Sequence, residues 1–159
     1  MVAPEALEQV AFFRNLEPQE RAMLAPISHK RQYRAGETIF AEGTHVDSLR
    51  ILVSGMVSFR QQQRSGGEEI SIGSICDEGA AFGITALLAR DMPGPHSAVC
   101  VEDTEVIEVD GAELLSLCEQ EPGVGLHLVM KLAAVMAERL TAAREQIRSR
   151  VRPGLISHG

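Results

Sequence analysis

The chain has 159 residues, a hydrophobic content of 45% and a formal net charge of −7 at pH 7, which suffices for one globular domain around a single core. The acidic balance disfavours a nucleic-acid-binding surface, and the lack of a signal pattern or of an apolar run of membrane length favours a cytoplasmic protein without a membrane partner. Cys76, Cys100 and Cys118 are widely spaced and form no CxxC pair, so we expect buried free thiols and no metal site.

Residues 1–28 predict a helical lead-in to the domain. A short helix is expected over residues 4–13, where apolar side chains recur on one side. A second helix is expected over 19–26, because Pro18 suits the first position of a helix.

Residues 29–110 predict a β-roll. Glycines recur between Gly36 and Gly83, and apolar side chains alternate with polar ones in the segments between and after them. A period of two, broken by glycine turns about every 8–12 residues, is typical of an antiparallel sandwich or barrel. Ser65-Gly66-Gly67 predicts a hairpin turn between two of the strands. The alternating segments are 49–53, 57–60, 70–72, 97–101 and 107–109.

Two helices are predicted after the roll, and together they form a C-terminal unit, 111–150. Asp110 is a candidate N-cap for a helix over 111–120, because an acidic residue three positions later matches a capping box. Pro122 interrupts this helix, and a longer one is expected over 123–150.

Apolar residues of the longer helix recur on alternating three- and four-residue steps. This spacing is the a/d seam of a coiled coil, held for about three heptads, and it predicts a homodimer. In a parallel pair, Arg139 and Arg144 fall at facing g and e positions, where exposed like charges repel each other weakly. A helix simply docked on the roll is the alternative. The predicted seam consists of Leu126, Val129, Ala133, Met136, Leu140, Ala143 and Ile147.

The stretch 78–88, closed by 95–98, is the candidate binding site. Gly79 and Gly83 bracket a chain reversal, and good helix formers follow. A glycine turn that feeds one helical turn leaves backbone N–H groups unpaired. Such groups favour an anion, and phosphate above all.

Several motifs between residues 12 and 145 resemble those of the cyclic nucleotide-binding domain, the sensor half of catabolite activator and Fnr (Crp/Fnr) regulators. The resemblance implies a mainly β fold with flanking helices: an eight-stranded β-roll, or jelly roll, with N-terminal helices and a long C-terminal dimerisation helix. It also implies a phosphate-binding cassette over residues 79–98. The matching motifs are Phe12–Leu16, Tyr33–Gly43, Leu52–Val57, Gly79–Gly83 and Ala86–Leu88.

Three departures from the family pattern bear on the ligand. Ile84 stands where cyclic nucleotide binders of this family have a Glu for the ribose 2′-hydroxyl, and His96 stands where they have an Arg for the cyclic phosphate. Ala143-Arg144 match the positions that contact adenine in the catabolite activator. Two lost charge-assisted contacts, at about 1.5–3 kcal/mol each, weaken binding by about two to four orders of magnitude. We therefore expect weak binding of cAMP or none.

The cassette implied by the resemblance supplies the predicted ligand-binding residues. A cyclic nucleotide or another small anionic ligand is the candidate occupant, and an acidic molecule with an apolar body suits the anion site at Gly83 to Thr85. His96 is either a pH-dependent anion contact or a loop histidine without a role. The predicted residues are Phe82, Gly83, Ile84, Thr85, Ala86, His96, Ser97 and Ala98.

Motifs of enzymes do not occur in the sequence. No His-x-His pair supports a cupin metal site, and there is no nucleophile elbow, Walker loop or dinucleotide fingerprint. We therefore expect no catalysis. Residues 151–159 read as a flexible tail and are too few for a helix-turn-helix, so we expect no direct DNA binding from this chain. It is either a free-standing sensor domain or lacks a C-terminal effector.

These patterns favour a small-molecule sensing and regulatory module of cyclic nucleotide-binding type with an altered ligand. Two alternatives stay open. One is a ligand-free dimerisation module, and the other is a genuine cyclic nucleotide binder with a variant cassette. The sequence does not name the effector partner.

Overall fold

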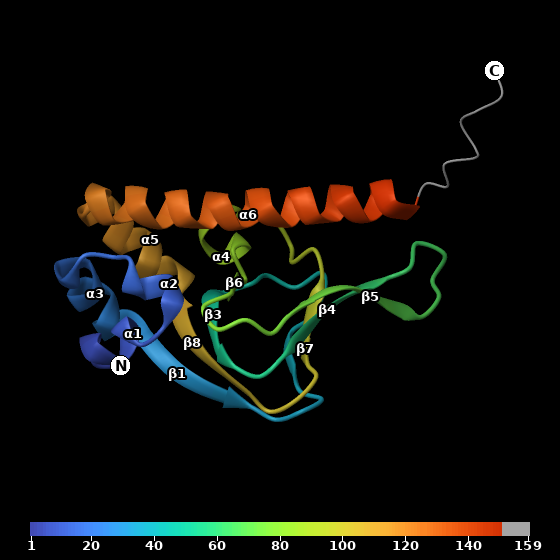
Figure 1. Cartoon of the computed structure of the whole chain (residues 1–159), viewed down its shortest axis with the longest axis horizontal. Coiled ribbons are helices and arrows are strands. Elements are labelled where there is room, and N and C mark those ends of the chain that lie inside the picture. The colour runs from blue at the N-terminus through green and yellow to red at the C-terminus, as the bar shows by residue number, and fades with distance from the viewer. Residues whose placement is uncertain (151–159) are drawn as a thin grey trace, which may run out of the picture.

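Two four-stranded antiparallel sheets form a β-roll in the computed structural model, which describes residues 1–150 (Figure 1). The strand order is β1-β8-β3-β6 in one sheet and β2-β7-β4-β5 in the other. The expected eight-stranded roll is confirmed, whereas the predicted tail 151–159 lies outside the described residues. The strands are β1 (Ser28–Tyr33), β2 (Thr38–Phe40), β3 (Ser48–Ser54), β4 (Val57–Gln62), β5 (Glu69–Ile75), β6 (Ala81–Phe82), β7 (Ser97–Cys100) and β8 (Thr104–Asp110).

Helices flank the roll at one end and along one side (Figure 1). The prediction of one helix over 4–13 is wrong, because Val10 is extended (φ −100°, ψ 126°) and divides the segment into two helices. The resulting turn buries Leu7, Val10 and Phe13. The helices are α1 (Pro4–Glu8), α2 (Ala11–Arg14), α3 (Pro18–Leu24), α4 (Thr85–Leu88), α5 (Gly111–Gln120) and α6 (Pro122–Arg150), with a 3₁₀ turn at Ala25–Ile27.

The helix starts follow the signals in the sequence. Pro18 occupies the first turn of α3, and the Asp110 carboxylate caps α5 by accepting the N–H of Glu113 at 3.0 Å. Helix α6 has 29 residues and lies along one whole side of the molecule (Figure 1). No helix within residues 1–150 has both the length and the apolar character that crossing a membrane requires.

The core has two parts, because successive side chains of a strand point to opposite faces of the sheet. Leu49 and Ile51 of β3 belong to the core between the roll and the helices, together with Leu132 of α6. Leu52 of β3 belongs to a second core inside the roll, together with Phe82. Each of these fully buried side chains stabilises the fold by about 1.5–3 kcal/mol. The two cores hold α6 and the cassette against the same sheet.

Some apolar residues lie outside these cores. Ile70 and Ile72 of β5 are 44% and 43% exposed, because the β4–β5 hairpin projects from the roll at the end away from the N-terminal helices (Figure 1).

The expectation of buried thiols is confirmed for Cys100 but wrong for Cys76, which is exposed, and Cys118 is half-buried. In the described part of the chain, no group of His, Cys, Asp and Glu side chains could hold a metal ion.

An ion pair lies inside the roll. Arg50 Nε donates to Glu108 Oε2 at 2.7 Å, and the Tyr33 hydroxyl donates to the same oxygen at 2.8 Å. The charged side chains are only 7% and 12% exposed. Burial raises the pKa of Glu108, but the guanidinium groups of Arg50 and Arg31 and the two hydrogen bonds outweigh it, so the pKa lies below its ordinary value of 4.5.

We expect Glu108→Gln to destabilise the domain by about 3–5 kcal/mol at neutral pH, because it removes the buried partner of the Arg50 charge and leaves only the exposed Asp47 beside it. A carboxylate with a lowered folded-state pKa stabilises the fold above its unfolded-state pKa, and this contribution is lost as pH falls through the folded-state value. Urea unfolding of both proteins from about pH 7 to about pH 3 should therefore show a stability gap that shrinks below pH 4.5. Glu102→Gln, at an exposed position, is the matched control, and a gap that stays constant with pH would contradict the prediction.

Candidate ligand-binding site

Gly83 positions the cassette turn between β6 and α4. Its φ of 70° lies in the left-handed region, which glycine adopts without steric cost. A Cβ at this position would lie 2.6 Å from the carbonyl oxygen of Ser48. The turn therefore packs against the start of β3 only because residue 83 has no side chain.

A cavity of about 140 Å³ lies at the cassette and extends to α6. Five of the eight predicted ligand-binding residues line it, namely Phe82–Thr85 and His96. The other three do not: Ala86 and Ala98 are fully buried, and the Ser97 hydroxyl oxygen accepts the N–H of Glu42 at 2.8 Å. The lining residues are Phe40, Val46, Phe82, Gly83, Ile84, Thr85, Pro95, His96, Met136 and Arg139.

Aromatic rings occupy the roll beside this cavity. The His96 ring centroid lies 4.7 Å from that of Phe59 and 5.9 Å from that of Phe40, and the Phe59 and Phe82 centroids are 6.0 Å apart. These tilted pairs are within the range of favourable ring contacts. The rings leave a space smaller than the roughly 300–1,000 Å³ of pockets for drug-sized ligands.

His96 is a neutral group in this environment. Burial lowers its pKa from the ordinary 6.5 and outweighs the contact with the Ser97 carbonyl, which raises the pKa. The positive charge of Arg139 lowers the pKa further, and Glu42 opposes it with the smallest effect. The lowered pKa favours the neutral imidazole at pH 7. The interpretation of His96 as a charged anion contact near pH 7 is disfavoured.

Arg139 of α6 is the charged residue at this cavity that sequence reasoning missed, and Phe40, Val46 and Pro95 also lie outside the predicted set. Its guanidinium donates to the Ala81 carbonyl and lies 5.9 Å from the Phe59 ring centroid. Burial lowers its pKa. Gly125 and Leu132 precede Arg139 at steps of seven, which places the three residues on one side of the helix, but only the structure shows that Gly125 and Leu132 are buried against the domain. From this side of α6, the Arg139 side chain reaches the cassette cavity rather than a partner helix.

The model of the cyclic nucleotide-binding domain family matches residues 30–121. The match covers more than half of the chain and includes the whole cassette. The chain belongs to the cyclic nucleotide-binding domain family. The eight-stranded roll, the short helix α4 within it and the long helix α6 are the architecture that this membership implies.

Two relatives and one solved structure show how this cyclic nucleotide-binding domain compares with known proteins. It is 33% identical to Glutaminase 2 of Bradyrhizobium diazoefficiens over 143 residues, and this match covers 89% of this chain and 21% of that protein. It is 31% identical to the Cyclic AMP receptor protein of Thermus thermophilus, over 82% of this chain and 57% of that protein. Its fold is similar to that of a putative cyclic nucleotide-binding protein from Geobacter metallireducens, with a TM-score of 0.75, 27% identity, and 88% and 99% of the two chains covered. The chain thus spans about a fifth of the glutaminase and less than three fifths of the receptor.

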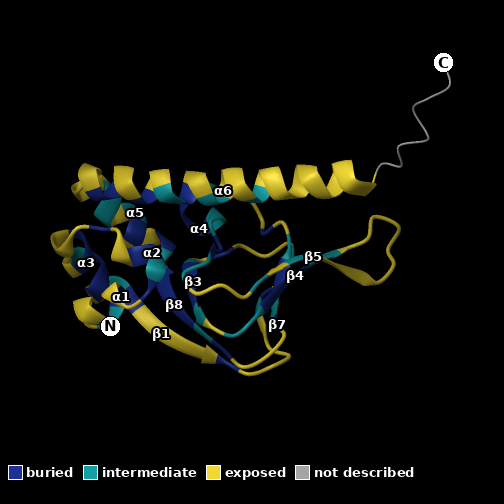
Figure 2. Cartoon of the chain, in the orientation of Figure 1, coloured by how far each residue is buried: buried dark blue, intermediate teal, exposed yellow. Residues whose placement is uncertain are grey.

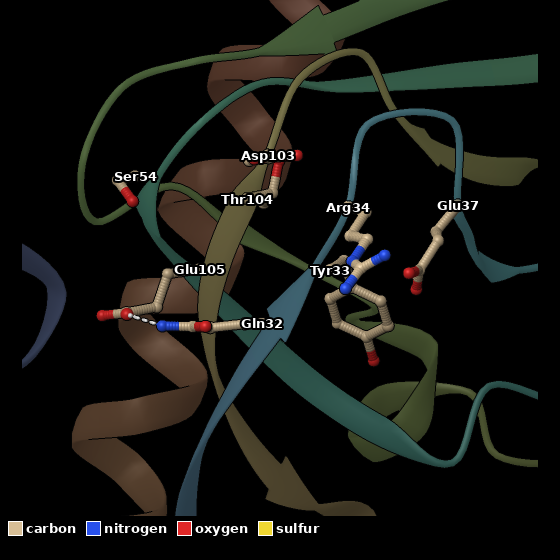
Figure 3. Close-up of a pocket in the computed structure, with 8 residues that line it drawn as sticks. All are labelled: Gln32, Tyr33, Arg34, Glu37, Ser54, Asp103, Thr104 and Glu105. Carbon is tan, nitrogen blue, oxygen red and sulfur yellow. Dashed lines mark hydrogen bonds between the residues drawn. The ribbon is translucent and has the colours of Figure 1, made fainter.

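A larger depression of about 490 Å³ lies elsewhere on this domain, where β1 ends and β8 begins (Figure 3). Figure 3 shows Gln32 and Glu105 pointing toward each other, joined by a hydrogen bond of 3.2 Å. Arg34, Glu37 and Asp103 also line this surface. This depression shares no lining residue with the cassette cavity. Its side chains carry charges of both signs, so it does not select one class of ligand.

We expect Gly83→Ala to lower the stability of the domain more than Gly36→Ala does. Both glycines have a left-handed φ, of 70° and 88°, which costs an alanine about 1–2 kcal/mol. A Cβ at Gly36 meets no atom within 4 Å, whereas one at Gly83 overlaps the Ser48 carbonyl oxygen. Urea unfolding measures both losses side by side, and equal losses would show that the close approach to β3 is not maintained in solution.

Proposed function

We propose that this chain is a sensing and regulatory module that binds a small molecule in the cassette cavity and dimerises through α6. Membership of the family supports regulation by a small-molecule ligand. The observation that carries the proposal is the placement of Arg139, which brings a cation from α6 to a cavity whose other lining residues carry no fixed charge. A ligand that meets Arg139 contacts the roll and the long helix at once.

The ligand of this module differs from cAMP. Ile84 and His96 both line the cavity, so neither a carboxylate for a ribose nor a fixed positive charge occupies those two positions. The single guanidinium of Arg139 enters from α6 instead. The cavity therefore combines a largely apolar wall with one cation, a combination that suits an acidic molecule with an apolar body.

We expect cAMP to bind more weakly than low-micromolar affinity, because the two charge-assisted contacts are missing. Titration calorimetry with cAMP measures this directly. The double variant Ile84→Glu with His96→Arg should regain only part of the affinity, since Ala143-Arg144 do not reproduce the adenine contacts. Low-micromolar or tighter binding to the unmodified chain would instead identify a genuine cyclic nucleotide binder.

A ligand-free dimerisation module is the second candidate, and the aromatic filling of the roll favours it. Phe40 and Phe59 already pack with both His96 and Phe82 where a ligand would enter. Thermal unfolding with cAMP, cGMP and a panel of metabolites separates the two candidates, because any ligand of the native state raises the melting temperature.

The seam of α6 supports a partner helix. All seven predicted seam residues are exposed, and the helix surface from residue 140 to 150 is uncovered (Figure 2). Leu126, Leu140 and Ile147 are 61%, 53% and 66% exposed. The alternation of three- and four-residue steps is the spacing that two helices need to pack together, so a second copy of this chain is the proposed occupant.

We expect Leu140→Glu with Ile147→Glu to give monomers, because the variant places four charges across a two-fold apolar interface. Analytical ultracentrifugation should find a dimer for the unmodified chain. Ala134→Glu with Ala142→Glu adds the same charges at exposed positions outside the seam and should leave the dimer intact. A monomeric unmodified chain at micromolar concentration would overturn the dimer.

We also propose that the module acts in the cytoplasm without a chemical step and passes its ligand state to a partner domain or protein. The match to about a fifth of a glutaminase supports this, since a similar segment there is part of a much longer chain. Pull-down with the ligand-bound and the ligand-free dimer would identify a partner that binds one state and not the other.

A further inference from the structure

The size of the cassette cavity limits its occupant. Its volume is about 140 Å³, and a cavity of about 150 Å³ lined by apolar side chains takes up one benzene molecule. A molecule with one ring and a short substituent therefore fits. A purine joined to a ribose phosphate does not fit unless the aromatic side chains move.

The walls favour a flat, aromatic body. Phe40, Phe82 and His96 present rings to the cavity, and Val46 and Ile84 add aliphatic surface. The ring centroids of Phe40 lie 6.2 Å from Phe82 and 5.9 Å from His96. A ligand ring among them gains offset or edge-to-face contacts, which an aliphatic body of the same size does not make.

The charge at the cavity favours an anion. Among the ten lining residues, all within residues 1–150, Arg139 alone carries a fixed charge, and none is Asp or Glu. Glu42 and Glu138 act on His96 and Arg139 from outside the lining. The guanidinium has five N–H donors, and its bond to the Ala81 carbonyl uses one of them. A planar carboxylate matches the remaining donors better than any single-atom acceptor.

We infer that the cavity binds a one-ring aromatic carboxylate, with its carboxylate paired to Arg139 and its ring among Phe40, Phe82 and His96. This inference rests on the proposed sensing function and names the ligand class for the same site. The ligand joins α6 to the cassette through Arg139. The neutral His96 contributes ring surface rather than charge.

Benzoate is the probe for this site, and benzyl alcohol is its uncharged counterpart of the same size. Titration calorimetry and thermal unfolding of the full chain should show benzoate binding at least about tenfold more tightly than benzyl alcohol, the effect of a charge-assisted hydrogen bond. Cyclohexanecarboxylate keeps the charge but lacks the aromatic ring, and it should bind more weakly than benzoate.

Three variants assign the contact. Arg139→Gln should reduce benzoate affinity to that of benzyl alcohol, and Arg139→Lys should retain part of it. Arg148→Gln removes an exposed arginine of the same helix and should leave the affinity unchanged. Ile84→Trp should block both probes, because the larger side chain fills the cavity. Thermal unfolding without ligand shows whether each variant is folded.

The outcomes separate this inference from the proposed function. Benzoate binding that Arg139→Gln does not weaken, or that Ile84→Trp does not block, would overturn the assignment of the site. Binding of cAMP or another metabolite without binding of benzoate would overturn the ligand class and leave the sensing function standing. Failure of every tested compound to bind would overturn both and favour the ligand-free module.

Discussion

The geometry of the cassette depends on close approaches of backbone that only glycine permits. A Cβ on Gly83 would lie 2.6 Å from the Ser48 carbonyl oxygen, and one on Gly111 would lie 2.4 Å from the Ala86 carbonyl oxygen. Helix α4 is thus fixed from both sides, against β3 before it begins and against α5 within it. This confinement directs Phe82 into the roll and leaves the residues after it at the cavity.

Inside the roll, the ion pair of Arg50 and Glu108 connects fold stability to the shape of the site. The Arg50 guanidinium lies over the Phe40 ring, 5.6 Å from its centroid, and Phe40 is one wall of the cavity. Glu108 holds this guanidinium in place from β8. A buried pair of this kind adds little net stability, because desolvation offsets the attraction between the charges. The pair instead fixes a position: Phe40, one wall of the cavity, packs against the Arg50 side chain, which cannot move without breaking its ion pair with Glu108.

The roll, the cassette and α6 could be predicted from the sequence because each has a local sequence pattern. Alternation, glycine turns and heptad spacing depend only on neighbouring residues. The break at Val10 and the exposure of Ile70 and Ile72 were missed, since they depend on what the rest of the chain covers. Arg139 was missed for the same reason. A helix offers several faces, and only the docking of Leu132 against the roll decides which face Arg139 shares.

Helix α6 places the cavity and the proposed dimer interface on one element. Met136 belongs to both: it lines the cavity and is 49% exposed within the seam. Arg139, one turn further along, reaches the cassette through the Ala81 carbonyl. In the proposed dimer, an occupant of the cavity would touch a residue that the partner helix also covers, so ligand binding and dimerisation would share contacts. Linkage then requires that the two act reciprocally, each changing the equilibrium affinity of the other by the same factor. A helix held only by packing on the roll would give a cavity without such a connection to the partner.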